Sequence, residues 1–152
     1  MAYNKEAVRK GTFSEAIVKA YYIYCGYNVL EINTHETHWD FVIEKEGDYS
    51  RVQVKTCVKV KFEEGKGNTL IRIRNKRGQN VRYNPEDYDI LVGVWVEGGK
   101  MYFFNSEDVN KEDQKETITV ERLDGKPLTR TKAPLPFKVE EFSIGKTWAD
   151  TH

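Results

Sequence analysis

The first clear pattern of hydrophobic positions begins near residue 12 and has the period of a helix. Thr12 and Glu15 have the spacing of a capping box, which predicts that residues 1–10 are a polar lead-in and that the helix starts at Thr12. Gly26 follows as its expected C-terminal glycine. Apolar residues spaced three and four apart predict one buried helical stripe, namely Phe13, Ala16, Ile17, Ala20, Tyr21 and Tyr24.

The rest of the chain shows mostly strand-like patterns. Two of the expected strands, 39–44 and 51–58, form a hairpin across a glycine turn, and strict alternation in 51–58 places Gln53 and Lys55 on the same face. Residues 88–96 are almost continuously apolar, which predicts a central strand buried on both faces. Further strands are expected at 27–32, 70–74, 81–83, 100–104 and 117–123, with a turn at 76–80, one helical turn within 105–116 and irregular structure beyond 123.

Composition limits the class of protein. The chain has 152 residues, of which 39% are hydrophobic and 32% charged, which predicts one soluble globular domain. No apolar run reaches the length of a membrane span, so no membrane partner is expected. Cys25 and Cys57 are too few for a disulfide framework and fit a reducing cytoplasm, where we expect the protein to be located.

The net charge of zero conceals an uneven distribution. Residues 51–82 carry ten Lys and Arg against two Asp and Glu, a local charge of +8. A solvated hairpin face would explain such a run, but a polyanion site is the alternative because of the residues beside it. The candidate DNA-binding residues are Lys59, Lys61, Lys66, Arg72, Arg74, Lys76, Arg77, Gln79, Asn80 and Arg82.

Three polar side chains interrupt the apolar strands next to this basic segment. Asp40 opens one strand, and Gln53 and Lys55 share a face of the next. The arrangement suggests a metal-assisted phosphodiesterase in which the Asp40 carboxylate, the Gln53 amide oxygen and the Val54 backbone carbonyl bind Mg²⁺. Lys55 would orient or deprotonate the attacking water.

Each of these residues also has an ordinary structural explanation. Glu15 could extend the site through a metal-bound water or could serve only as the capping partner of Thr12. Asp40 and Lys55 could form a plain cross-strand salt bridge, and Gln53 could cap an exposed sheet edge. We expect solvated or structural roles for the loop residues His35 and His38, and a packed thiol rather than a nucleophile at Cys57.

The order helix-borne Glu15, then Trp39-Asp40, then Gln53-Val54-Lys55 resembles the core motif of the PD-(D/E)xK nuclease superfamily. It looks most like the cyanobacterial group I intron-encoded homing endonuclease, and archaeal Holliday-junction resolvases and type II restriction enzymes are similar at the motif level. Trp39 replaces the usual Pro, and Gln53 replaces an acid, which removes one formal charge from the metal site. That replacement would also suit a decayed nuclease fold that binds DNA without cutting it.

The resemblance implies an α/β (α+β) fold, with a central mixed β-sheet flanked by helices and an added basic β-ribbon for DNA. One nuclease domain over 1–152 would comprise a catalytic core at 11–58 and 88–104, the ribbon at 59–83 and a candidate oligomerisation segment at 134–150. The implied activity is Mg²⁺-dependent, sequence-specific cleavage of double-stranded DNA, with Mn²⁺ or Ca²⁺ able to substitute for binding. The alternatives are a junction resolvase, a restriction-type nuclease and the non-catalytic module. A symmetric homo-oligomer is expected, dimeric or tetrameric, with the tetramer favoured by the resemblance.

Overall fold

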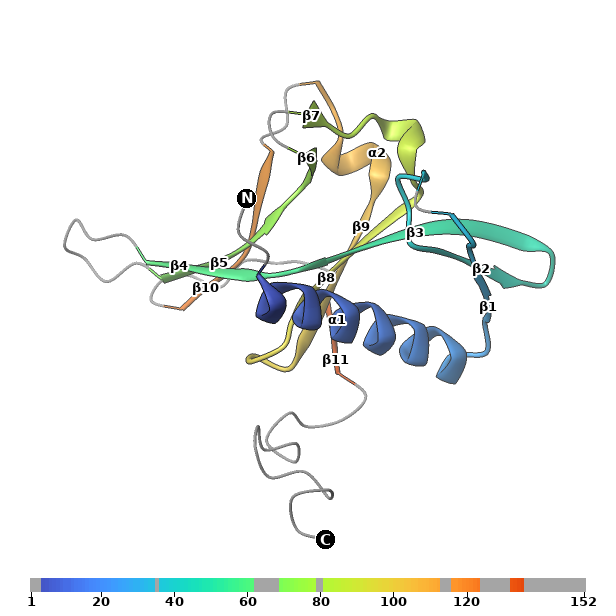
Figure 1. Cartoon of the computed structure of the whole chain (residues 1–152), viewed down its shortest axis with the longest axis horizontal. Helices are drawn as coiled ribbons and strands as arrows, with labels where there is room; N and C mark the ends of the chain where they lie inside the picture. Colours follow the sequence, from blue (N-terminus) through green and yellow to red (C-terminus); the bar gives the residue numbers. More distant parts are fainter. Residues whose placement is uncertain are drawn as a thin grey trace, which may run out of the picture.

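The computed structural model describes residues 4–34, 36–61, 69–78, 81–112, 116–123 and 132–135 (Figure 1). These residues form a long N-terminal helix followed almost entirely by strands. The elements in chain order are α1 (Lys5–Tyr24), β1 (Asn28–Glu31), β2 (Phe41–Lys45), β3 (Asp48–Thr56), β4 (Val58–Lys61), β5 (Thr69–Arg74), β6 (Lys76–Gly78), β7 (Val81–Arg82), a 3-10 turn (Pro85–Asp87), β8 (Ile90–Trp95), β9 (Lys100–Asn105), α2 (Ser106–Val109), β10 (Thr117–Arg122) and β11 (Lys132–Pro134).

The main sheet has six strands in the order β1-β2-β3-β8-β9-β11. Strands β3 and β8 are parallel, whereas the other neighbours are antiparallel, which confirms the predicted mixed sheet. The predicted central strand is also confirmed, because Leu91, Val92 and Val94 of β8 are fully buried between β3 and β9. Helix α1 lies along one face of this sheet (Figure 1).

Helix α1 begins about two turns earlier than the sequence pattern predicts. Asn4, not Thr12, is the N-cap, and its side chain accepts a hydrogen bond from the Ala7 N–H at 3.1 Å. Thr12 lies inside the helix, and its hydroxyl donates a hydrogen bond to the Val8 carbonyl at 3.0 Å. For residues 5–10 the predicted polar lead-in is therefore wrong, because these residues are helical but exposed, and an exposed helical segment shows no hydrophobic periodicity. Gly26, at φ +92°, follows the helix as expected.

The buried stripe of α1 is also rotated from the predicted one. Ser14, Ile17, Val18 and Tyr22 are buried, whereas Tyr24 is 90% exposed and Phe13 lies at the surface. Ser14 belongs to this stripe because its hydroxyl bonds the Thr56 hydroxyl of β3 at 2.8 Å. A count of apolar positions misses such a polar helix–sheet contact.

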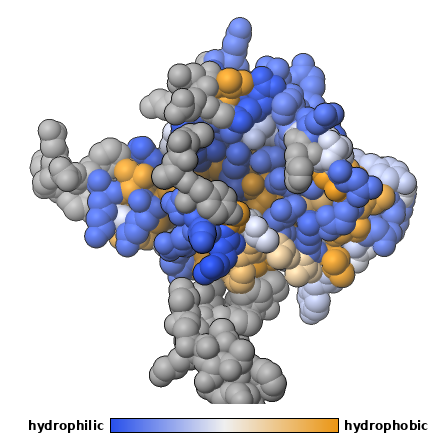
Figure 2. Space-filling model, viewed as in Figure 1, coloured by the Kyte–Doolittle hydropathy of each residue, from blue (hydrophilic) through white to orange (hydrophobic). Residues whose placement is uncertain are grey.

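Figure 2 shows hydrophobic residues scattered over an otherwise mostly hydrophilic surface.

A three-stranded sheet, β10-β5-β4, packs on the face of the main sheet opposite α1. The predicted two-stranded basic ribbon is therefore wrong: β5 lies between β4 and β10, and β6 and β7 form a separate hairpin. Ile71 and Ile73 of β5 point inward as predicted and are fully buried. The pairing with β10 joins segments more than forty residues apart, which local alternation cannot reveal.

The strand β11 also differs from the prediction, because residues beyond 123 were expected to be irregular. It pairs with β9 at the edge of the main sheet, and Leu135 completes the hydrophobic core beneath α1. Apart from residues 134 and 135, the candidate oligomerisation segment lies outside the described residues. Within the described part of the chain, no helix combines the length and the hydrophobicity needed to cross a bilayer.

The two sheets lie close together at Gly93 of β8. A methyl group at this position would lie 2.2 Å from Cδ1 and 2.7 Å from Cγ1 of the buried Ile73. We expect Gly93→Ala to lower the free energy of unfolding by about 1–3 kcal/mol, because the facing sheets would have to move apart. Chemical denaturation measures this change.

Gly11→Ala is the matched control, because Gly11 is exposed in α1 and a methyl group there would contact nothing within 4 Å. This variant should raise the free energy of unfolding by about 0.5–1 kcal/mol, since Ala is the better helix former. Equal stability changes in the two variants would show that the close approach at Gly93 is not a packing constraint.

Candidate active site

Asp40 lies just before β2 begins, where β3 continues past the end of its pairing with β2. The register of the pair stops at Phe41 opposite Val52, so the end of β3 extends past its neighbour. Asp40 fills this position with two hydrogen bonds to β3: its N–H donates to the Val52 carbonyl at 2.8 Å, and its Oδ2 accepts the Val54 N–H at 2.7 Å. The carboxylate thus supplies the hydrogen-bond acceptor that a neighbouring strand would otherwise offer to the Val54 N–H.

The Val54 carbonyl faces the same edge. In an extended strand the N–H and C=O of one residue point to the same side, and the Val54 N–H points toward Asp40. The Asp40 carboxylate and the Val54 carbonyl therefore place oxygen atoms of two kinds along the same short edge of β3. The Val54 side chain packs separately, in the hydrophobic core beneath α1.

Lys55 extends from β3 on the side opposite α1. Its ammonium donates to the Lys76 carbonyl at 3.1 Å and lies 5.3 Å from the centre of the Tyr83 ring. Burial lowers the pKa of Lys55, the Asp40 carboxylate raises it, and the Arg74 guanidinium lowers it. Lys55 is therefore within electrostatic reach of both the acid and the basic strand.

Burial raises the pKa of Asp40 above its ordinary value, against the lowering effect of the Val54 N–H. The Glu15 carboxylate raises this pKa further, whereas the ammonium groups of Lys55 and Lys19 lower it. The ionised form of Asp40 is consequently costly in this position, and an additional cation beside it would stabilise the carboxylate.

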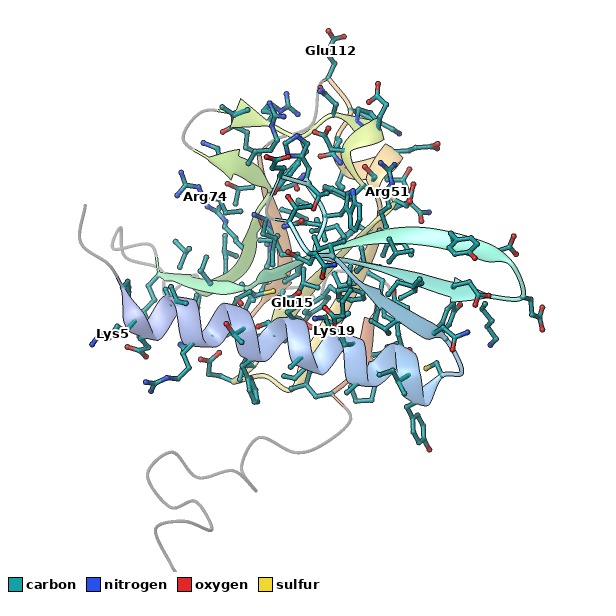
Figure 3. All side chains as sticks on the ribbon, turned by 45° about the vertical axis from the view of Figure 1, so that its right-hand side comes forward. Lys5, Glu15, Lys19, Arg51, Arg74 and Glu112 are labelled. Atoms are coloured by element: carbon teal, nitrogen blue, oxygen red, sulfur yellow. The ribbon has the colours of Figure 1, made fainter. Side chains whose placement is uncertain are left out.

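Glu15 and Asp40 line the same cleft, of about 330 Å³, which lies between α1 and the loop before β2. Figure 3 shows Glu15 and Lys19 on the side of α1 that faces the strands. Lys19 bonds Glu15 at 3.3 Å and Glu31 at 2.9 Å. The capping explanation for Glu15 is wrong, because the helix starts at Lys5 and Glu15 lies in its third turn.

Gln53 lies on the face of β3 that also carries Lys55 and is only 7% exposed. It does not cap an exposed edge, because β3 is an interior strand between β2 and β8. The salt-bridge explanation for Asp40 also fails: among the described residues its carboxylate bonds Val54, the Lys55 ammonium bonds Lys76, and no ion pair joins the two side chains. Burial raises the pKa of Cys57 to about 12, as expected for a packed thiol.

The donor set suits a hard divalent cation. Mg²⁺ typically takes one or two carboxylates, other oxygen atoms and waters, which is what Asp40, Glu15, Gln53 and the Val54 carbonyl offer. In the described ranges no three His, Cys, Asp or Glu side chains gather in a way that would hold a metal. A site formed mainly by acidic side chains is therefore absent from this part of the chain, and backbone and amide oxygens would have to contribute.

The candidate DNA-binding residues divide between two faces of the three-stranded sheet. Cross-strand partners share a face, and the register places Val58 opposite Arg72 but Lys59 opposite Ile71. The exposed Lys59 and Lys61 thus lie on the opposite face from Arg72 and Arg74.

The remaining candidates lie on the β6–β7 hairpin or outside the described residues. Lys76 pairs with Glu116 at 2.6 Å, Arg82 donates to the carbonyls of Lys111 and Glu112, and Arg77 bonds His38 at 3.0 Å. Lys66, Gln79 and Asn80 lie outside the described residues, as does His35.

Several residues next to the site were not identified from the sequence. Tyr83 beneath Lys55 and the buried Asn75 beside Lys76 are examples, and Lys19 is another. The i,i+4 spacing of Glu15 and Lys19 is a sequence signal for their ion pair. The other contacts depend on long-range pairing and have no local signature.

The electrostatic contacts of Lys55 predict opposite effects of two substitutions. Asp40→Asn keeps an oxygen to accept the Val54 N–H but removes the charge, so the pKa of Lys55 should fall below its wild-type value. Arg74→Gln removes a repelling cation, so the same pKa should rise. Side-chain NMR of Lys55 across a pH titration measures both, and a pKa that moves in neither variant would contradict this description of the site.

Comparison with known proteins gives the family and the fold of the chain. A solved structure of a bacterial homing endonuclease, I-Ssp6803I, matches with a TM-score of 0.62 and 22% identity, over 79% of this chain and 81% of the other, which is a likeness of fold. No curated protein matches. The family model described as PD-(D/E)XK endonuclease matches residues 5–131, which include α1, the main sheet to β9 and the three-stranded sheet. The chain therefore belongs to the PD-(D/E)XK endonuclease family.

Proposed function

We propose that this nuclease is a metal-dependent endonuclease of homing type that cuts double-stranded DNA at a specific sequence. The observation that carries the proposal is the position of Asp40: its partly buried carboxylate is bonded to the Val54 N–H and lies within electrostatic reach of Lys55. Acid, backbone carbonyl and amine are therefore neighbours at one end of β3. The family assignment and the fold of the homing endonuclease I-Ssp6803I support the same conclusion.

In this proposal Asp40, the Val54 carbonyl and Gln53 hold Mg²⁺, which acts as a Lewis acid toward the phosphodiester when bound. Lys55 orients the attacking water and offsets the negative charge that develops on the phosphate. Its lowered pKa leaves a larger fraction of its side chain as the neutral amine, the form that can accept a proton, than in an exposed lysine. Glu15 lines the cleft beside Asp40 and would bind a water of the metal shell.

DNA would be held by the basic segment that follows β3. Arg72 and Arg74 share the face of β5 that does not enter the core, and Arg74 is near enough to Lys55 to affect its pKa. We propose that these arginines contact the bases. Lys59, Lys61 and Lys66 would contact phosphates, with Lys59 and Lys61 on the opposite face of the sheet and therefore against a different part of the DNA. Arg77 on β6 would add sequence readout, together with Lys76 and Arg82, which pair at the base of the β6–β7 hairpin. Gln79 and Asn80 are proposed to read bases as well.

Cutting both strands of a nearly palindromic site requires two active sites related by symmetry. We therefore propose a symmetric homo-oligomer, with a tetramer as the preferred form and residues 134–150 as a candidate interface. Light scattering combined with chromatography measures this state directly. The free thiols of Cys25 and Cys57 agree with a reducing compartment such as the cytoplasm.

Cleavage of a randomised DNA library with Mg²⁺ present, followed by sequencing of the products, tests the activity and its specificity together. On the selected site, Asp40→Ala and Lys55→Ala should each lower the single-turnover cleavage rate by about 10²–10⁴-fold, because each group acts on the reacting phosphate. DNA affinity should change much less in Lys55→Ala.

Asp48→Ala is the control for Asp40, since Asp48 is exposed at the β2–β3 turn, and it should cut at the wild-type rate. Wild-type cleavage by Lys55→Ala would refute the site. Salt-sensitive binding without cleavage in Mg²⁺ or Mn²⁺ would identify a non-catalytic module. Stronger binding to branched DNA than to every linear sequence would identify a junction resolvase.

Metal binding can be measured without cleavage. Asp40→Asn should weaken Mn²⁺ binding at least about tenfold in calorimetry, because losing a direct ligand costs no less than losing a group that orients one. Asp48→Asn removes a carboxylate of the same kind away from the site and should leave the affinity unchanged. Equal Mn²⁺ affinities in wild type and Asp40→Asn would show that Asp40 is not a ligand.

A further inference from the structure

The partners of the Lys55 ammonium come from a separate part of the fold. Lys55 itself belongs to β3 of the main sheet, but its hydrogen-bond acceptor is the Lys76 carbonyl of β6, and the ring beside it belongs to Tyr83, which follows β7. An ammonium group on four methylene groups has many rotamers. These two contacts therefore restrict where it can lie.

The Lys76 carbonyl is positioned by the residue before it. Asn75 is 3% exposed and separates β5 from β6. Its backbone N–H donates to the Glu116 carbonyl at 2.8 Å, its side-chain amide donates to Asn110 Oδ1 at 2.7 Å, and its Oδ1 accepts the Tyr88 hydroxyl at 2.9 Å. A buried amide with partners on both of its side-chain atoms fixes one orientation of the chain at this point.

The Tyr83 ring is positioned by Tyr88, the tyrosine whose hydroxyl bonds Asn75. Tyr88 is fully buried, and its ring meets that of Tyr83 edge to face, with centroids 5.2 Å apart. The Tyr88 ring thus supports one partner of Lys55, and the Tyr88 hydroxyl, through Asn75, supports the other. The Tyr88–Asn75 hydrogen bond connects the two supports.

We propose that the Tyr88–Asn75 hydrogen bond positions Lys55 for DNA cleavage, so that Tyr88, Asn75 and Tyr83 are positioning residues of this nuclease. The inference rests on the proposed function, in which Lys55 is catalytic. It adds a link to the DNA-binding surface, because Lys76 and Arg77 lie on the hairpin whose carbonyl holds Lys55. DNA contacts that move β6 would move the acceptor of the Lys55 ammonium.

The fold provides a matched control for a purely structural effect. Tyr102 is also fully buried, and its hydroxyl donates to the buried Glu121 at 2.8 Å, on β10. Tyr88→Phe and Tyr102→Phe each remove one buried hydroxyl and leave its acceptor with one donor fewer. Only Tyr88→Phe removes a bond to Asn75.

The experiment compares single-turnover cleavage at saturating DNA with DNA affinity for the full-length variants. Tyr88→Phe should lower the rate constant about 10- to 100-fold with little change in affinity, because misplacing a reacting group by about 1 Å has an effect of this size. Tyr102→Phe should keep the wild-type rate constant. NMR contacts between the Lys55 methylene protons and the Tyr83 ring should weaken in Tyr88→Phe and persist in Tyr102→Phe.

A second pair of variants tests the ring if Tyr88→Phe does not fold. Tyr83→Leu should cut more slowly than Tyr83→Phe, which keeps an aromatic face for the ammonium. Equal rates in this pair, or a wild-type rate and unchanged NMR contacts in Tyr88→Phe, would overturn the inference. Lys55→Ala distinguishes a failure of the proposed function from a failure of the positioning role. If Lys55→Ala cuts at the wild-type rate, the proposed function is wrong. If it is inactive while Tyr88→Phe is fully active, only the positioning role is wrong.

Discussion

The hydrogen bond from the Val54 N–H to the Asp40 carboxylate is the contact on which the site depends. It forms because β3 continues past the end of β2, which leaves a backbone donor that needs an acceptor. A side chain supplies that acceptor, so the acid and the Val54 carbonyl share an edge without any further element to align them. The bond therefore orders the strand end and, at the same time, holds a charged group where solvation is poor.

The two faces of the main sheet contribute differently to this strand end. Helix α1 brings Glu15 from one face, with Lys19 bonded to it, and the β5–β6 segment brings the Lys76 carbonyl to Lys55 on the other face. Asp40 lies between them in the plane of the sheet and responds electrostatically to Glu15, Lys55 and Lys19. The helix, the hairpin and the three-stranded sheet are thus all close to one short stretch of backbone.

Local patterns explain which parts of this arrangement can be predicted from the sequence. Alternation correctly places Gln53 and Lys55 on one face and Ile71 and Ile73 in the core, since these depend only on neighbours along the strand. The start of α1, the rotation of its buried face toward Ser14 and the pairing of β5 with β10 depend on other elements. Local patterns also do not identify Asn75, Tyr83 and Tyr88, because their proposed role at Lys55 depends on contacts with residues distant in the sequence.

The small residue at the contact between the two sheets has a consequence for DNA recognition. Gly93 lies opposite Lys55 in the pairing of β3 with β8, and it leaves just enough room for Ile73, the neighbour of Arg74. The distance between the two sheets at this point therefore sets the separation between Lys55, at the proposed site, and Arg74, which is proposed to read the bases. In the proposed function, a bulkier side chain at Gly93 would lengthen that separation and so change which phosphate is cut relative to the bases that are read.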